Sequence, residues 1–227
     1  MEGDSPSYFS LLNNGLASYR NPGWGGWGGR YVFRQPSGES RPIWTQGGDS
    51  YPGSPNSRDT VIGVDGQSYT SDQGTIWRWR KAFQNDFAAR MDWTMKEFGD
   101  ANHNPVVVVN GDTTKGPVFI ATKIGDPVAL SAAGTKDPDG HKLTYNWFHY
   151  QEATSAISKP AKPEEILGKR GEEELAILPE VRIENADARE ATAIPQAAGV
   201  AHIILAVQDD GILSLTSYRR VILEIED

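Results

Sequence analysis

The chain has 227 residues, of which 38% are hydrophobic and seven are tryptophan, so it is long and apolar enough for one large or two ordinary globular domains. Thirty acidic against 22 basic residues give a net charge of −8, and no run of Lys or Arg is interleaved with aromatic residues, which argues against a nucleic-acid partner. Residues 1–6 lack the pattern of a signal peptide. The sequence contains no apolar stretch of about eighteen residues, so no membrane partner is expected. The lack of cysteine excludes disulfides and thiolate metal sites.

The first 71 residues are rich in Gly, Pro, Ser and Asn, which predicts a loop-dominated segment with short strands at 29–34 and 42–45. Its most distinctive part is the segment 21–31, where two tryptophans and a tyrosine stand on a backbone that is almost entirely glycine. Such a backbone predicts a shaped loop rather than a helix or strand. We call residues 21–31 the glycine-tryptophan loop.

Flat aromatic faces beside hydrogen-bonding groups are typical of a sugar-binding surface, whereas the alternative for each tryptophan is burial in a core. The sequence leaves both interpretations open. The candidate stacking residues are Trp24, Trp27, Tyr31 and Trp44, and the candidate hydrogen-bonding residues are Asn21, Arg30 and Asp49.

One amphipathic helix is expected over about residues 73–98. Thr70 and Gln73 have the spacing of a capping box, and Gly99 is a normal helix stop. The apolar stripe of this helix would run through Ile76, Trp79, Phe83, Phe87 and Met91.

After residue 104 the pattern changes to short β-strands separated by Gly, Pro and Asp turns. Seven strands in about 120 residues predict an antiparallel sandwich of the immunoglobulin type, with Trp147 inside it. The charged segment 159–174 is expected to be an exposed loop. The expected strands are 106–109, 118–121, 127–132, 143–150, 175–178, 201–207 and 215–225.

The predicted fold is therefore mainly β with one long helix. A loop-rich N-terminal α+β segment, residues 1–100, precedes an immunoglobulin-like antiparallel β-sandwich, residues 104–227.

Two acidic turns are candidate metal ligands at one end of that sandwich. Asp137 and Asp139 lie in an Asp-Pro-Asp-Gly turn, and Asp209 opens an Asp-Asp-Gly turn. Calcium suits hard carboxylate oxygens on such loops, but Asp and Gly are also what plain turns require. The four histidines show no metal-ligand spacing and no catalytic motif is recognisable, so no catalytic residue is assigned.

The tryptophan-rich blocks carry a family resemblance. The segments Glu2–Ser7, Asn14–Leu16, Trp24–Tyr31, Arg41–Trp44 and Ile76–Trp93 look like the C-terminal part of bacterial nucleoside-hydrolase-like proteins described as cellulose-binding. The segments 137–140, 143–147 and 218–221 are similar to the immunoglobulin-like domain that ends those proteins.

The resemblance implies that residues 1–100 are the C-terminal portion of a nucleoside-hydrolase-like domain whose catalytic aspartate cluster this chain lacks. It implies a fragment or a truncated gene product. Asp4 would correspond to a late aspartate of a calcium site, but one ligand cannot bind calcium, and a surface or capping role is the alternative.

Three functions follow from these expectations. The first is a polysaccharide-binding accessory region, with calcium as the one candidate cofactor. The second is a set of substrate-positioning loops for a hydrolase acting on N-ribosides or related glycosides, inactive as this chain alone. The third is a structural module that docks the missing N-terminal hydrolase-like domain. The resemblance also implies an extracellular or periplasmic location.

Overall fold

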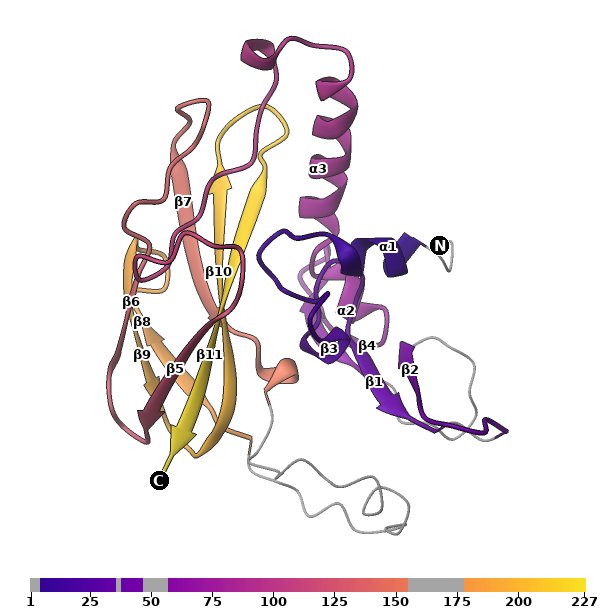
Figure 1. Ribbon diagram of the computed structural model, residues 1–227, viewed down its shortest axis with the longest axis vertical. Coiled ribbons are helices and arrows are strands. Elements are labelled where there is room, and N and C mark those ends of the chain that lie inside the picture. The colour runs from indigo at the N-terminus through magenta and orange to yellow at the C-terminus, as the bar shows by residue number, and fades with distance from the viewer. Residues whose placement is uncertain (1–4, 36–37, 47–56, 155–177) are drawn as a thin grey trace.

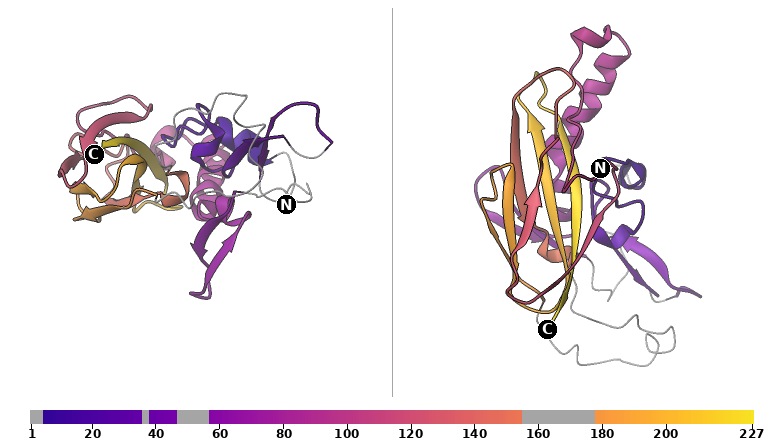
Figure 2. Two further views of the ribbon diagram at one scale, coloured as in Figure 1. Left: turned by 90° about the horizontal axis from the view of Figure 1, so that it is seen from below. Right: turned by 60° about the vertical axis from the view of Figure 1, so that its left-hand side comes forward.

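The computed structural model describes residues 5–35, 38–46, 57–154 and 178–227. The fold is mainly β, as predicted, with one longer helix (Figure 1). A β-sandwich formed by the C-terminal half lies beside a loop-rich N-terminal part, and Figure 2 shows the two side by side from below. Among the described residues, no helix is long and apolar enough to cross a membrane.

The N-terminal part consists of short elements. The glycine-tryptophan loop leads into the β1–β2 hairpin, which projects away from the sandwich (Figure 1). A second hairpin, β3–β4, is followed by the helices. The bounds are α1 (Ser5–Leu11), η1 (Pro22–Trp24), β1 (Tyr31–Arg34), β2 (Ile43–Gln46), β3 (Asp59–Ile62), β4 (Ser68–Ser71), α2 (Gly74–Trp77), α3 (Arg80–Trp93) and η2 (Phe98–Asp100).

The long helix predicted over 73–98 is two helices, α2 and α3, and α3 ends at Trp93. The break follows from Trp79, which has φ −103° and ψ −2° and whose side chain is 3% exposed, because it packs against the sandwich. Thr70 does not cap the helix. Its hydroxyl lies 2.8 Å from that of Thr60 across the β3–β4 hairpin, and the Gly74 N–H donates to Ser71 Oγ at 3.0 Å instead.

The sandwich has two sheets within the described residues, ordered β5-β11-β10-β7 and β6-β9-β8. The prediction of a wholly antiparallel sandwich is wrong in one pair, because β5 runs parallel to β11. The bounds are β5 (Val118–Lys123), β6 (Val128–Ser131), β7 (Leu143–His149), η3 (Gln151–Ala153), β8 (Val181–Glu184), β9 (Glu190–Pro195), β10 (Gly199–Asp209) and β11 (Thr216–Glu226).

The other strand predictions differ in detail. Residues 106–109 form isolated bridges rather than a strand, through Val106 with Lys136 and Val109 with Asp112. Residues 159–174 and most of the strand expected at 175–178 lie outside the described residues. Strands β3, β4, β8 and β9 were not predicted.

The sandwich core contains Trp147, as predicted. Its side chain is 1% exposed and its Nε1 donates to the Ala188 carbonyl at 3.1 Å. Ile203, Leu205 and Val207 of β10 face the same core, as period-two alternation requires.

The opposite face of β10 and β11 is also covered. Ile204 of β10 and Tyr218 of β11 pack against Leu16, Trp27 and Trp79 of the N-terminal part. The central strands β10 and β11 are therefore buried on both faces, and the N-terminal loops pack on them.

Candidate functional site

The glycine-tryptophan loop is anchored to the sandwich by Arg220 of β11, whose side chain is fully buried. Its guanidinium donates to the carbonyls of Leu16 at 2.7 Å, Trp24 at 3.0 Å and Gly25 at 2.9 Å. Gly25 has φ +74°, and a Cβ there would lie 2.4 Å from the Tyr150 hydroxyl. The glycine therefore serves close packing against the sheet.

His202 supports Arg220 from the neighbouring strand, with Nδ1 2.9 Å from Arg220 Nη1. Burial and the adjacent Arg220 cation lower the pKa of His202 to about 2. The imidazole is therefore neutral and accepts the arginine N–H. Trp24 is half-buried, with its ring centroid 5.5 Å from that of His202.

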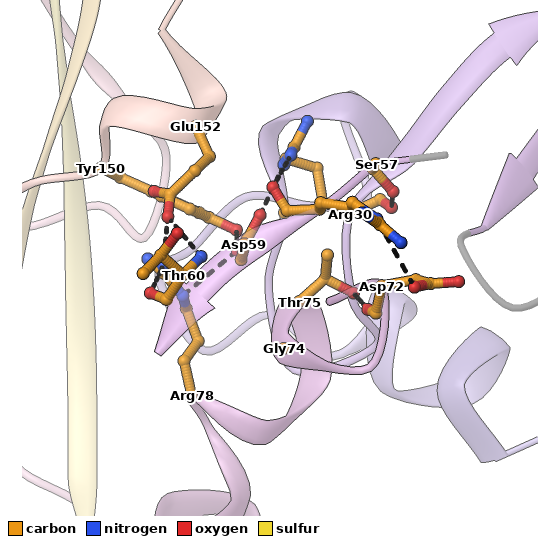
Figure 3. A network of polar contacts seen from close by, with 12 residues as sticks. Arg30, Ser57, Asp59, Thr60, Asp72, Gly74, Thr75, Arg78, Tyr150 and Glu152 are labelled. Carbon is orange, nitrogen blue, oxygen red and sulfur yellow. Dashed lines mark hydrogen bonds and ion pairs between the residues drawn. The ribbon is translucent and has the colours of Figure 1, made fainter. Parts of the chain in front are cut away.

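A second buried network is centred on Asp59, which is fully buried (Figure 3). Arg30 Nε donates to Oδ1 at 3.0 Å, Arg78 Nε lies 3.1 Å from Oδ2, and the Tyr150 hydroxyl donates to Oδ2 at 2.6 Å. Burial, then the Asp59 charge, raise the pKa of Tyr150, so its hydroxyl stays protonated. Arg78 also reaches Glu152 at 2.9 Å, which links the hairpin, the helices and the sandwich.

These networks decide the roles of several predicted sugar-binding residues. Trp27, a candidate for stacking on a sugar, is instead a core residue. It is 2% exposed and lies edge-on to Phe83 and Tyr218, so its ring has no face for a ligand. Arg30 is held by Asp59. Asn21 Oδ1 accepts the Gly23 N–H at 2.8 Å and caps the short helix η1.

Trp44 is on the surface, as a stacking role requires. Its side chain is 44% exposed and pairs across the β1–β2 hairpin with Phe33, which is 53% exposed, at a ring-centroid distance of 5.2 Å. Tyr31 is half-buried at the base of the same hairpin. Asp49 and Asp4 lie outside the described residues.

A hollow lies between the β3–β4 hairpin, the α2–α3 helices and the outer face of the sheet. Its volume is about 1050 Å³, and we call it the aromatic cleft. The most exposed aromatic residues in its lining are Trp77, at 38%, and Tyr69, at 44%. Phe148 and Tyr218 line it from the sheet, and Asn85, Gln84, Asn146, Arg80 and Lys81 add hydrogen-bonding groups.

The aromatic walls are held by polar contacts. The Arg80 guanidinium lies 5.6 Å from the Trp77 ring centroid, and the Tyr69 hydroxyl donates to Asp65 at 2.7 Å. That hydrogen bond lowers the pKa of Asp65, which is ionised at neutral pH. Among the described residues that line the cleft, Asp65 is the one carboxylate.

Sequence reasoning missed Trp77 and Tyr69. A usable signal was present in Trp77-Arg78-Trp79-Arg80, because two tryptophans two positions apart cannot share one helix face. With Trp79 in the buried stripe, Trp77 has to point elsewhere.

Of the predicted metal residues, the three in the described part of the chain, Asp137, Asp139 and Asp209, lie at one end of the sandwich. Asp137 and Asp139 lie close together, joined by His141, which was not expected to be a ligand. Asp209 is linked to the same end through Asn102, whose Nδ2 donates to its Oδ1 at 3.1 Å.

The comparisons with known proteins agree at both ends of the chain. Residues 127–225 match the family described as the C-terminal domain of cellulose-binding protein Sde0182. Residues 1–31 match the family described as the nucleoside hydrolase-like domain of cellulose-binding Sde182. No curated protein matches the sequence.

Several solved structures are similar to this chain, and one of them matches over the whole of this chain. It is a nucleoside hydrolase-related hypothetical protein from Saccharophagus degradans associated with carbohydrate metabolism, with 31% identity and a TM-score of 0.69. The match covers 100% of this chain and 48% of that one, so the chain spans about half the length of this relative. A PKD domain from the KIAA 1837 protein matches at 22% identity over 49% of this chain and 84% of its own, with a TM-score of 0.30, which is too low to support an inference.

Proposed function

Because this chain resembles the cellulose-binding, nucleoside-hydrolase-like proteins at both ends, we propose that it is a carbohydrate-binding region of such a protein and that the aromatic cleft holds the sugar. The observation that carries the proposal is the exposure of Trp77 and Tyr69 in a concave site surrounded by amides and cations.

The chemistry of the cleft fits a neutral polysaccharide. Aromatic faces cover the C–H faces of pyranose rings, while Asn and Gln amides both donate to and accept from hydroxyl groups. A volume of about 1050 Å³ is at the upper end of ordinary ligand sites and leaves room for more than one sugar unit. The contacts of Arg80 with Trp77 and of Asp65 with Tyr69 hold both rings in place before binding, which reduces the entropy lost on binding.

The number of carboxylates in the described lining of the cleft favours sugar binding over glycoside hydrolysis as its function. Glycoside hydrolysis typically uses a pair of carboxyl groups, one on each side of the scissile bond. In the described lining of the cleft, Asp65 stands alone and is hydrogen-bonded to Tyr69. We therefore propose that hydrolysis belongs to the hydrolase-like domain, the partner that the resemblance implies. The protein would lie outside the cytoplasm, where insoluble polysaccharide occurs.

The test is retention of the purified chain on insoluble cellulose. Trp77→Ala should weaken retention at least about tenfold, since stacking surfaces at interface centres carry most of the binding energy. Trp44→Ala is the matched control, because it removes another exposed tryptophan from outside the cleft. Retention that depends on Trp44 and not on Trp77 would move the site to the β1–β2 hairpin, and no retention of the folded wild type would refute carbohydrate binding.

A second function is favoured by the apolar face between α1 and α3. Tyr8 and Phe87 are 71% and 61% exposed there and line a shallow hollow of about 190 Å³. Leu11 and Met91 of the same helices are 70% and 55% exposed. We propose that this face docks the nucleoside-hydrolase-like domain, because α1 lies in the segment that matches that family.

The docking proposal predicts that the isolated chain self-associates through the uncovered face. Phe87→Ser should then lower the sedimentation-average mass at high concentration, whereas Phe33→Ser, on the β1–β2 hairpin, should leave it unchanged. A wild-type chain that stays monomeric at high concentration would argue against docking there.

A further inference from the structure

The loop between β6 and β7 gathers two carboxylates and an imidazole. Asp137, Asp139 and His141 each offer a ligand atom, and these atoms lie within 4.8 Å of one another. The turn is fixed by Asp137 Oδ1, which accepts the N–H groups of Asp139 at 2.9 Å and His141 at 3.0 Å. Alternate residues of the loop are thereby brought to one point.

The second oxygen of Asp137 is an independent observation. The side chain is 1% exposed, and Oδ2 is buried with no hydrogen-bond partner among the described residues. His141 Nδ1, Asp209 Oδ2 and Asn102 Oδ1, at the same end of the sandwich, are also buried without one in the described part of the chain. A buried polar atom left without a partner costs roughly 1–3 kcal/mol, and more when it is charged.

The contact between His141 and Asp137 does not supply the missing partner. His141 Nδ1 lies 3.4 Å from Asp137 Oδ1, the oxygen that already accepts two N–H groups, and therefore leaves Oδ2 without a donor. A cation bound between the side chains would satisfy Oδ2 and reduce the repulsion between the two carboxylates.

We propose that Asp137, Asp139 and His141 form a binding site for a divalent transition-metal ion of the zinc class, completed by water. The donor set decides the class of ion. Calcium takes six to eight oxygen ligands, whereas among the described residues two carboxylates converge here together with an imidazole, a ligand that zinc favours. Asp209, expected as a calcium ligand, is not in the group of described residues whose ligand atoms lie within 4.8 Å of one another, and its Oδ1 accepts N–H groups from Asn102, Gly211 and Leu215.

The surroundings supply the second layer of contacts that metal ligands usually have. The His103 N–H donates to Asp139 Oδ2 at 2.6 Å, and its Nδ1 lies 3.0 Å from Oδ1. The His103 ring is stacked on Phe98 and on Trp93, at centroid distances of 3.9 and 5.5 Å. A bound ion would thus fasten the end of α3 to the sandwich, and Trp93 would report on it.

Zinc binding by the chelator-treated chain tests the proposal. Calorimetric titration with ZnCl₂ should give one equivalent bound and a higher melting temperature, while CaCl₂ should give neither. Asp137→Asn keeps the Oδ1 acceptor that fixes the turn but removes the charge, and should weaken binding at least about tenfold, as should His141→Gln. Asp126→Asn, an exposed acid in the turn between β5 and β6, is the matched control and should bind zinc like the wild type.

Cobalt(II) provides a readout that a change in folding alone would not produce, because a nitrogen ligand alters its visible spectrum. The wild type and Asp126→Asn should show this spectrum, and His141→Gln should lose it. Absence of zinc binding by the wild type, undiminished binding by Asp137→Asn and His141→Gln, or a preference for calcium would each overturn the proposal.

Discussion

Single side chains decide how the N-terminal part is attached, and Asp59 is the clearest case. It is fully buried between Arg30 and Arg78 and accepts the Tyr150 hydroxyl. Asp59→Asn would leave Arg30 without its counter-charge and Arg78 paired with Glu152 alone. We expect a loss of about 3–5 kcal/mol in the free energy of unfolding, measured by urea denaturation.

The matched control is Asp72→Asn. Asp72 lies 4.0 Å from Arg58, whose side chain is 64% exposed, so screening by water limits the expected loss to about 1 kcal/mol or less. Equal losses in the two variants would show that the Asp59 network does not stabilise the fold.

His202 predicts a dependence of stability on pH. Its pKa is lowered to about 2 in the folded state, mainly by burial, against about 6.5 in the unfolded chain. The unfolded state therefore binds a proton first as the pH falls, and stability is lost below about pH 6.5, by up to about 1.4 kcal/mol per pH unit. His149, whose pKa burial lowers to about 4, acts in the same direction.

His202→Asn removes the titrating group and keeps an oxygen that can accept from Arg220. Urea denaturation between about pH 7.5 and 5.5 should show a shallower loss of stability in this variant than in the wild type. An unchanged slope would mean that His202 is not buried and neutral as described.

The sequence predicted that aromatic and hydrogen-bonding side chains gather in the glycine-tryptophan loop, but it did not predict what these side chains contact. Rings and hydrogen-bonding groups do gather there, but Arg220 and Asp59 recruit them for packing. Both partners are far along the chain, at separations of 196 and 29 residues, so no local pattern indicated them. Of the predicted stacking residues in the described part, Trp44 is the one that lies exposed on the surface.

At the scale of elements, the contact between the segment before the glycine-tryptophan loop and β11 can be tested with a glycine. Gly15 has φ +95°, and a Cβ there would lie 1.7 Å from the Tyr218 carbonyl oxygen. Gly111 has φ +79°, but a Cβ there would meet nothing within 4 Å. Both alanine variants incur left-handed backbone strain of roughly 1–2 kcal/mol.

Gly15→Ala should therefore lower the free energy of unfolding by roughly 1–3 kcal/mol more than Gly111→Ala, because only Gly15 is in close contact with a strand backbone. Thermal or urea denaturation of both variants measures the difference. Losses of the same size would contradict the close packing of this segment on β11.

Five of the sandwich strands, β5, β6, β7, β10 and β11, were predictable because alternating apolar residues and Asp-Gly turns are local signals, as in the strand around Trp147. The break between α2 and α3 was not predictable, since the apolar stripe through Trp79 continues across it. The break is made by packing of Trp79 against Tyr150 and Tyr218, which lie in the other half of the sequence.

At the scale of the whole molecule, the aromatic cleft is assembled from three parts of the chain, namely the β3–β4 hairpin, the α2–α3 helices and the sheet. The sequence indicated a sugar-binding protein through composition and family resemblance, but the position of the cleft depends on how these parts pack. Trp77 and Asn146 meet there although 69 residues separate them. A proposed site of this kind cannot be read from local spacing.

The most direct test of the central claim is the indole N–H region of a two-dimensional NMR spectrum, recorded while a soluble cello-oligosaccharide is added. The chain has seven tryptophans, and Trp77→Phe identifies the signal of Trp77. We predict that the Trp77 signal shifts saturably while those of the buried Trp27 and Trp147 do not move. A saturable shift of Trp44 with Trp77 unmoved, or no shift of any indole, would contradict sugar binding in the aromatic cleft.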